Sequence, residues 1–402
     1  MIPNHIRREL SVKTPSKIVF LVLDGLGGLP SGADGKTELE RARTPNLDAL
    51  AAQSALGLST PLAPGLTPGS GPAHLALFGY DALEHNIGRG ALSALGVGFD
   101  LGPNDLAARM NFCTVDASGS VTDRRAGRIP TALNERLCAR LRAEVHVPGV
   151  ELHVLTEEQY RAVVVFQGPG LDDHLGDSDP QHTGVPPQAV EALTPAAAHS
   201  ADLANQFVAE ARRVLESEHP ANMVLLRGFA THPSLPSFAD LYKLTPAAIA
   251  AYPMYKGLAR IVGMAVLGAP HTIAEEVALL REHWDQHDFF YLHVKPTDSA
   301  GEDGDPARKA AVIEEFDALL PQVMALRPDV LVITGDHSTP STLKSHSWHP
   351  LPLLLHSAHV IPEGRAGYSE RAAANGSLGH LRHADVLDFA MANALKYDKF
   401  GA

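Results

Sequence analysis

Residues 17–24 read KIVFLVLD, in which a short apolar run, residues 18–23, is followed directly by an aspartate. The run is continuously hydrophobic rather than alternating, which is typical of a strand buried on both faces of a parallel sheet. Two later segments follow the same plan: residues 289–294 lead into KPTDSAGEDGD, and residues 330–334 lead into GDHS. Helical patterns lie between them, for example PARKAAVIEEFDALLPQVMAL at residues 306–326. Strands that alternate with helices predict an α/β fold with a mostly parallel sheet flanked by helices.

Candidate metal ligands cluster where these strands end. In open α/β sheets, functional groups collect in the crevice at the carboxyl ends of the strands. Any one aspartate there could be a helix cap, and any one histidine could be an ordinary core or surface residue. Several carboxylates with imidazole, however, suit Mg²⁺, Mn²⁺ or Zn²⁺, and two such ions can clamp a phosphoryl group from both sides. The candidates are Asp24, Asp298, Glu302, Asp336, His337 and His346.

A serine precedes a helix-like run in TPGSGPAHLALFGYD, residues 67–81. If Ser70 stands at the start of a helix, the first helix amides would point at a group bonded to its oxygen, which makes a natural phosphate seat. An N-cap serine is the other interpretation that this stretch allows. A serine-hydrolase elbow requires G-x-S-x-G, and Pro68 and Pro72 occupy the glycine positions, so this interpretation fails.

The composition is ordinary for a soluble globular protein, with 45% hydrophobic and 20% charged residues. Its 402 residues favour two domains, and its formal net charge of −13 argues against a nucleic-acid or anionic-membrane binder. Two cysteines, Cys113 and Cys138, do not make a disulfide framework and fit a reducing compartment. The start, MIPNHIRREL, is too polar for a signal peptide, and residues 17–24 are far shorter than a membrane span of ~20 residues. We expect a cytoplasmic protein that acts on a small molecule, with the oligomeric state left open.

The middle of the chain differs in character. Residues 101–235 contain several arginines and the loop LDDHLGDSDPQHTGVPPQ, which is rich in glycine, proline and aspartate. We interpret this region as a second, smaller α/β domain inserted into the first. The first domain would then comprise residues 1–100 and 236–402, resuming at LTPAAIAAYPMYKGLARIVGM as a strand followed by a helix.

Motifs spread nearly end to end resemble those of the cofactor-independent phosphoglycerate mutases of the archaeal type, within the alkaline phosphatase superfamily. Besides the stretches quoted above, they are VLDGLGG, GKTELERARTPNLDALA, GRGALSALGVG, NFCTVD, DRRAGRI, VLLRGFA and GSLG. The resemblance implies an alkaline-phosphatase-like fold. It also implies an isomerase of glycolysis and gluconeogenesis that interconverts 3-phosphoglycerate and 2-phosphoglycerate without a 2,3-bisphosphoglycerate cofactor.

The resemblance also implies a role for each matching residue. Ser70 matches the nucleophile that becomes phosphoserine. Lys256 matches a group that grips the substrate, as do three arginines of DRRAGRI, namely Arg124, Arg125 and Arg128. One metal would be held by Asp24, Ser70, Asp336 and His337. The other would be held by Asp298, the residue four positions later, and His346.

One position departs from the family pattern. Glu302 stands where the family has a histidine, in D-x-x-G-H or a similar pattern. Glutamate is a harder ligand than imidazole, so it favours Mn²⁺ or Mg²⁺ over Zn²⁺. We therefore expect two divalent ions, with the identity of the second one depending on Glu302.

The charge of the substrate class fits the arginine-rich region. Phosphoglycerate carries a phosphate and a carboxylate, and a net negative protein must meet them with a local cationic cluster. Arg124, Arg125 and Arg128 supply one, and arginine can grip both groups bidentately, although a single arginine is usually a solvated surface residue. Asp123 is our candidate for proton transfer to and from the glycerate hydroxyls; a structural salt bridge would explain it equally well.

Two other functions compete with the mutase. A metal-dependent phosphomonoesterase of the same superfamily would use the same serine and metals and release phosphate to water. The inserted domain favours the mutase, because a hydrolase has no need to retain the alcohol product. A non-catalytic binding protein for phosphorylated metabolites would make Glu302 a mark of decay, and the presence of all the other candidate ligands argues against it.

Overall fold

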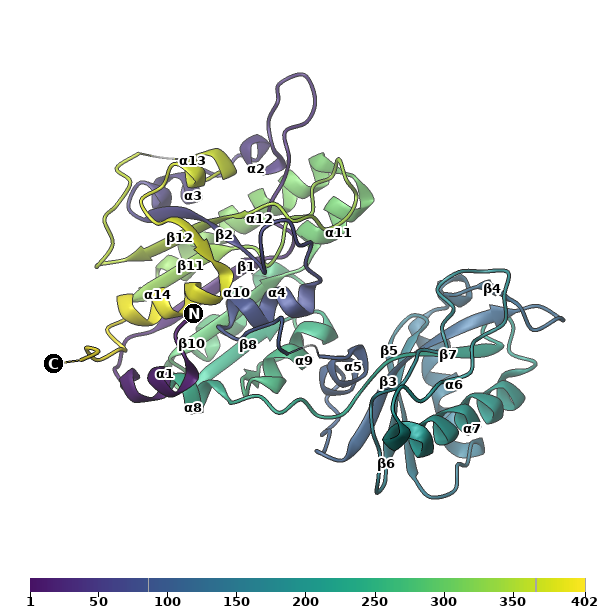
Figure 1. The fold of residues 1–402 in the computed structure, drawn as a ribbon. Helices are drawn as coiled ribbons and strands as arrows, with labels where there is room; N and C mark the ends of the chain where they lie inside the picture. Colours follow the sequence, from purple (N-terminus) through teal and green to yellow (C-terminus); the bar gives the residue numbers. More distant parts are fainter. Residues whose placement is uncertain (86, 366, 402) are drawn as a thin grey trace. The chain divides into compact units, whose positions relative to one another are not determined.

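The computed structural model describes residues 1–85, 87–365 and 367–401, and the chain divides into two compact units (Figure 1). The first unit is Met1–Asn86 with Pro236–Ala402, and the second is Ile87–Leu235. The second unit thus interrupts the first in sequence.

The first unit is built on a mixed, mostly parallel sheet. Among the described residues it has eight strands in the order β13-β2-β12-β11-β1-β10-β8-β9. The antiparallel member is β12, which pairs with both β11 and β2. The strands are β1 (Ile18–Leu23), β2 (Ala55–Thr60), β8 (Pro246–Ala250), β9 (Ala265–Val266), β10 (Phe289–Val294), β11 (Val330–Thr334), β12 (Leu351–Ser357) and β13 (Gly379–Arg382). The predicted α/β fold is confirmed, and the three apolar runs of the sequence are the central strands β11, β1 and β10.

Helices cover both faces of this sheet, which is why its central strands are apolar throughout. Every residue of β1, β10 and β11 is buried. One face packs against α3, α10 and α12, while α4 and α14 lie on the other. The helices of this unit are α1 (Asn4–Leu10), α2 (Glu38–Arg41), α3 (Pro45–Ala51), α4 (Ser70–Leu77), α8 (Phe238–Tyr242), α9 (Pro253–Ile261), α10 (Ile273–Glu282), α11 (Pro296–Asp303), α12 (Pro306–Met324), α13 (Glu370–Ala374), α14 (His383–Asn393) and the 3₁₀ turn η3 (Trp284–Gln286).

The parallel register aligns the carboxyl ends of the central strands. Leu23 of β1 lies opposite Val294 of β10, and Val22 lies opposite Thr334 of β11. The segments that follow these three strands therefore leave the sheet side by side. This is the edge at which functional groups gather in such sheets.

The second unit contains an antiparallel sheet in the order β4-β3-β6-β5, with β7 paired to β3. Helices α6 and α7 pack on one face of it. The elements are α5 (Arg89–Gly96), β3 (Asp105–Val115), β4 (Val121–Asp123), η1 (Ala126–Arg128), α6 (Thr131–Glu144), β5 (Glu151–Glu158), β6 (Arg161–Gln167), η2 (Pro195–Ala197), α7 (Ala198–Leu215) and β7 (Met223–Ala230).

The second unit begins at Ile87, earlier than the residue 101 expected from the sequence. The physical reason is α5, which packs closely on β3. A Cβ atom added to Gly90 would lie only 2.1 Å from the carbonyl oxygen of Ala107. The helix α5 is thus packed against the strands of the second unit.

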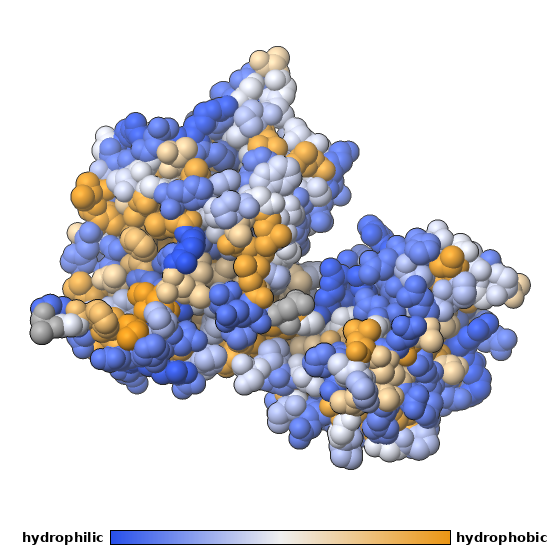
Figure 2. Space-filling model, viewed as in Figure 1, coloured by the Kyte–Doolittle hydropathy of each residue, from blue (hydrophilic) through white to orange (hydrophobic). Residues whose placement is uncertain are grey.

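Figure 2 shows mostly hydrophilic residues on the visible face of the second unit, with hydrophobic residues gathered around α14 of the first. Three exposed hydrophobic side chains belong to this C-terminal part of the chain: Phe389, Leu395 and Phe400. A search of the described residues for a helix with the length and apolar character of a membrane span finds none.

Candidate active site

The predicted ligands of the first metal lie together at the sheet edge. Asp24 directly follows β1, and Asp336 and His337 follow β11 after one glycine; all three side chains are buried. One ligand atom from each lies within 4.8 Å of the others. His337 Nε2 is 3.3 Å from Asp24 Oδ1 and 3.1 Å from Asp336 Oδ2. The three residues face one point between the two strand ends.

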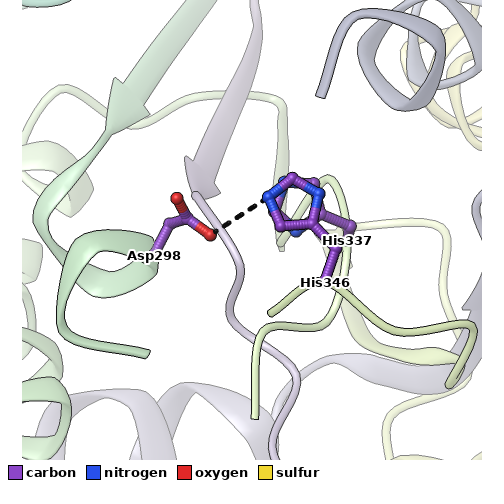
Figure 3. A group of neighbouring side chains, drawn as sticks. All are labelled: Asp298, His337 and His346. Carbon is purple, nitrogen blue, oxygen red and sulfur yellow. Dashed lines mark ion pairs between the residues drawn. The ribbon is translucent and has the colours of Figure 1, made fainter. Parts of the chain in front are cut away.

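A second group of possible ligands adjoins the first. Asp298 from α11 and His346 from the loop before β12 join His337, again with ligand atoms within 4.8 Å (Figure 3). His346 Nε2 lies 3.6 Å from Asp298 Oδ1, and the rings of His346 and His337 stack at 3.6 Å. His337 therefore stands between the two groups rather than within the first alone.

Glu302 lies at the rim of the second group and not inside it. Its Oε1 is 3.8 Å from His346 Nε2, and 55% of its side chain is exposed. Partial burial and the neighbouring Asp298 raise the pKa of the Glu302 carboxyl. The residue can reach the group only if its side chain turns inward.

Hydrogen bonds fix which nitrogen of His337 can bind a cation. The Thr339 hydroxyl donates to Asp298 Oδ1 at 2.7 Å, and its oxygen lies 3.0 Å from His337 Nδ1. Because this hydroxyl has one proton and gives it to the carboxylate, Nδ1–H must be the donor to Thr339. The lone pair of His337 is then on Nε2, which faces Asp24 and Asp336. Such outer hydrogen bonds commonly orient metal-binding histidines.

The group has carboxyl oxygens without hydrogen-bond partners in the described part of the chain. Asp24 Oδ1 and Asp336 Oδ2 are buried without a hydrogen-bond donor among the described residues. Burial opposes ionisation of Asp24, yet Lys295 and His293 outweigh it and hold the pKa of Asp24 well below its usual range. Burial together with Asp24 raises the pKa of Asp336 well above its usual range. Two orphaned oxygens and one imidazole lone pair at one point fit a divalent cation.

Ser70 is the first residue of α4, and its hydroxyl lies beside this group. Its Oγ is 3.1 Å from His337 Nε2. The N-cap residue of α4 is Gly69, and no side chain caps the helix. The hydroxyl of Ser70 therefore points toward the candidate ligands, at the start of α4. Pro72 has no N–H, and the amide of the residue after it donates to the Gly69 carbonyl oxygen. Ser70 and Gly71 therefore carry the amides that remain at this helix start.

Several residues that support Asp24 were not singled out from the sequence. Tyr255 of α9 donates its hydroxyl hydrogen to Asp24 Oδ2, and Lys295 Nζ lies 3.0 Å from the same oxygen. His293 Nε2 is 3.3 Å away, and its ring stacks on Tyr255. The sequence carries a weak signal for two of these residues. His293 is the next-to-last residue of strand β10 and Lys295 directly follows the strand, and β10 is the neighbour of β1, which Asp24 follows.

His74 is a further buried residue at the site. One turn after Ser70 on α4, its Nδ1 is 2.8 Å from the Ser70 carbonyl oxygen and 3.3 Å from Asp336 Oδ2. Burial and the neighbouring His293 lower the pKa of His74 to about 3, so the ring is neutral and Nδ1–H donates. His74 thereby connects the start of α4 to a candidate metal ligand.

Lys256 belongs to the first unit as well. It follows Tyr255 on α9, which packs against α4. The side chain is half-buried, and burial together with Arg260 lowers the pKa of its amine. The packing of these two helices puts a lysine on the element next to Ser70.

The remaining predicted residues share one turn of the second unit. Asp123 ends β4, and its carboxylate accepts the amides of Arg125 at 2.8 Å and Gly127 at 2.6 Å. It thus stabilises the turn that carries the arginines. Arg125 and Arg128 are exposed.

Arg124 is not a free surface residue. Its guanidinium makes two hydrogen bonds to the buried Asp179, at 2.8 Å and 2.7 Å. Arg227 of β7 approaches the same carboxylate at 3.5 Å. Asp179 therefore holds two arginines in place, and Arg227 is a candidate anion-binding residue that the sequence reasoning did not select.

Comparisons with known proteins agree on one family. The family model of 2,3-bisphosphoglycerate-independent phosphoglycerate mutase matches residues 51–222. Over 401 residues the chain is 52% identical to a probable 2,3-bisphosphoglycerate-independent phosphoglycerate mutase of Thermus thermophilus, covering 99% of each chain. A relative of the same description from Deinococcus radiodurans is 51% identical, with 98% of each chain covered.

Two solved structures are similar over nearly the whole chain. A protein from Pyrococcus horikoshii superposes with a TM-score of 0.83 at 32% identity, covering 96% of this chain and 99% of that one. A cofactor-independent phosphoglycerate mutase from Thermoplasma acidophilum superposes with a TM-score of 0.72 at 31% identity, covering 94% of this chain and all of the other.

Proposed function

The chain belongs to the family of 2,3-bisphosphoglycerate-independent phosphoglycerate mutases, and from this membership we propose that it interconverts 3-phosphoglycerate and 2-phosphoglycerate through a phosphoserine at Ser70. The observation that carries the proposal is the position of Ser70. Its hydroxyl stands at the start of a helix, 3.1 Å from His337, beside two buried carboxylates. This arrangement brings together a nucleophile, a phosphate-binding helix start and a cation-binding site.

Two divalent cations are part of the proposal. Asp24, Asp336 and His337, with Ser70, would hold one, while Asp298 and His346, with Glu302 turned inward, would hold the other. Because oxygen ligands outnumber nitrogen ligands in these sets, Mn²⁺ or Mg²⁺ fits them better than Zn²⁺. When bound, a dication lowers the pKa of a coordinated hydroxyl and neutralises phosphate charge.

The residues of the first unit would carry the phosphoryl transfer. After the Ser70 hydroxyl gives up its proton to solvent, its Oγ would form a bond to phosphorus as the bond from phosphorus to the glycerate oxygen breaks. That oxygen would take up a proton delivered by Asp123. The amides at the start of α4 hydrogen-bond to phosphate oxygens, and Lys256 adds a positive charge. His74 and Tyr255 hold the start of α4 and Asp24 in place, which matters because this chemistry depends chiefly on positioning and charge.

The second unit would retain the glycerate between the two transfers. The intermediate alcohol must stay bound and present its other hydroxyl to the phosphoserine, and water must be excluded to avoid hydrolysis. Arg124 presents a guanidinium oriented by Asp179, and Arg125 and Arg128 on the same turn offer two more cationic groups. Asp123 is the proposed proton carrier for the glycerate hydroxyls, in addition to its hydrogen bonds within the turn.

The direct test is an enolase-coupled assay with 3-phosphoglycerate, run beside an assay for free phosphate. A mutase gives phosphoenolpyruvate and almost no free phosphate. A phosphomonoesterase, which the serine and metal ligands of the first unit could also support, gives free phosphate without phosphoenolpyruvate. The second result would overturn the proposal. Addition of 2,3-bisphosphoglycerate should not change the mutase rate.

A further inference from the structure

Lys295 connects the two groups of candidate metal ligands. Its ammonium nitrogen lies 3.0 Å from Asp24 Oδ2 and 2.5 Å from Asp298 Oδ2. Asp24 belongs to the first group and Asp298 to the second. We propose that Lys295 is a resident cation of the site, which neutralises one carboxylate of each group and thereby weakens the binding of both dications. The inference rests on the proposed function, because it presupposes that these groups bind metal.

The fold determines this position. Leu23 and Val294 are opposite each other in the parallel register, so the residues that follow them, Asp24 and Lys295, emerge side by side. Lys295 also immediately precedes α11, and Asp298 stands three residues later in its first turn. An i, i+3 spacing brings the two side chains together on one face. One lysine thus reaches a carboxylate on its own segment and another on the next strand.

The oxygens of Asp24 are divided between Lys295 and the cation position. Oδ2 receives Lys295 and the Tyr255 hydroxyl, while Oδ1 has no hydrogen-bond donor among the described residues and faces His337. A dication can therefore bind through Oδ1 while the ammonium remains on Oδ2. The two cations then share a carboxylate in a buried site, where like charges repel strongly because the dielectric constant is low.

This arrangement has two measurable consequences. First, the ammonium holds buried carboxylates together before any dication arrives, so its loss should destabilise the metal-free protein more than the metal-saturated protein. Second, the ammonium opposes dications, so its loss should tighten their binding. If Lys295 only oriented the metal ligands, its removal would have the opposite effect on affinity, namely weaker binding of the dications.

The experiment measures Mn²⁺ binding to metal-depleted protein by calorimetric titration, with thermal unfolding of the metal-free and Mn²⁺-saturated forms. We expect Lys295→Met to bind Mn²⁺ on the order of tenfold more tightly than the wild type. We expect the unfolding midpoint of the metal-free variant to fall by about 5 °C or more, since one partner of a buried ion pair is lost. Saturating Mn²⁺ should recover most of that loss.

Two variants serve as controls. Lys295→Arg keeps the charge and should bind Mn²⁺ nearly as the wild type does. Lys13→Met removes the same charge from an exposed position before β1 and should leave affinity unchanged. If metal-free Lys295→Met does not fold, the variant can be prepared with Mn²⁺, and release of Mn²⁺ to an excess of chelator should be slower than from the wild type.

Contrary outcomes separate this inference from the proposed function. Equal or weaker Mn²⁺ binding by Lys295→Met, or equally fast release, would overturn the resident-cation role while leaving the metal site intact. If Lys295→Met lowered the unfolding midpoint equally in the metal-free and the Mn²⁺-saturated protein, Lys295 would only form a stabilising ion pair. A wild-type protein that binds no Mn²⁺ or Mg²⁺ would instead refute the proposed metal site, and this inference with it.

Discussion

Ser70 is the residue whose replacement tests the proposed chemistry most directly. Ser70→Ala removes the oxygen that would bond to phosphorus, and loss of a covalent nucleophile typically lowers turnover on the order of 10⁴-fold or more. The fold should persist, since Gly69 is the N-cap of α4 and no side-chain cap is lost. Turnover in the enolase-coupled assay and the intact mass of protein mixed with substrate are the measurements. Only the wild type should gain a phosphoryl group.

The matched control is Ser299→Ala, which changes an exposed serine on α11 that is not a candidate ligand. It should keep near-normal turnover. If Ser70→Ala did so too, Ser70 would be no more than the first residue of a helix.

Glu302 is the residue expected from the sequence to depart from the family pattern, and its position at the rim of the second group makes its role measurable. Glu302→Ala should weaken Mn²⁺ binding at the second group and reduce turnover, because an anion that attracts the dication is lost. High Mn²⁺ should partly restore turnover. Glu302→His should retain more activity and shift the metal preference toward Zn²⁺, since imidazole is the softer ligand. Glu302→Gln separates charge from shape. Activity titrated with each metal measures all three.

The control for Glu302 is its exposed neighbour, with Asp303→Ala removing the same charge one residue away. Titration curves of Glu302→Ala that coincide with those of the wild type and of Asp303→Ala would show that Glu302 faces solvent and does not ligate.

Some residues of the candidate site could be predicted from the sequence, and others could not. Asp24, Asp298 and Asp336 follow apolar strands, and parallel strands end at a common edge, so their proximity could be expected. The supporting roles of Tyr255 and His74 could not, because each depends on where another element packs. Tyr255 reaches Asp24 from a helix more than two hundred positions away in the chain, and no local pattern encodes that contact.

At the level of helices and strands, continuous apolar runs predicted the central strands correctly, because a central parallel strand is buried on both faces. The strands β1, β10 and β11 occupy the predicted residues, and so does α12, except for its last two positions. The boundary of the second unit was harder to place. The helix α5 is short and apolar, and from the sequence alone such a helix could belong to either unit. Its close approach to β3 assigns it to the second unit.

Gly90 tests that packing. Gly90→Ala adds a Cβ at 2.1 Å from the carbonyl oxygen of Ala107, so α5 must move away from β3. Overpacking against backbone typically costs about 1–3 kcal/mol, which should lower the unfolding midpoint of the second unit by several degrees. Gly176→Ala is the control, because its new Cβ would find its nearest neighbours at an ordinary 3.7 Å. Equal midpoints for the two variants in thermal unfolding would mean that α5 adapts without cost.

Over the whole molecule, charge is distributed unevenly with respect to the proposed substrate. The chain carries a formal net charge of −13, yet a phosphorylated carboxylic acid must bind to it. In the first unit the carboxylates at the strand ends would repel a phosphate unless cations cover them. In the second unit the arginines around Asp179 offer positive charge without metal. Binding of the substrate's phosphate to the first unit should therefore depend on metal. Because turnover needs that binding, the turnover of the complete enzyme should depend on metal as well.

Metal removal is the corresponding test on the full chain. Exhaustive chelation should abolish turnover, and Mn²⁺ should restore it, while 2,3-bisphosphoglycerate should have no effect. If dications bind the buried carboxylates only in the folded protein, as proposed, they should also raise its stability, by about 2.7 kcal/mol when free metal exceeds the dissociation constant a hundredfold. The measurements are turnover and the unfolding midpoint across a Mn²⁺ titration of one metal-depleted preparation. Turnover should level off once the site is filled, whereas the midpoint should begin to rise near the same dissociation constant and continue to rise with the logarithm of the Mn²⁺ concentration. Full turnover in protein verified to be free of metal would contradict the two-metal proposal, and a midpoint indifferent to Mn²⁺ would place the required ions away from Asp24, Asp298 and Asp336.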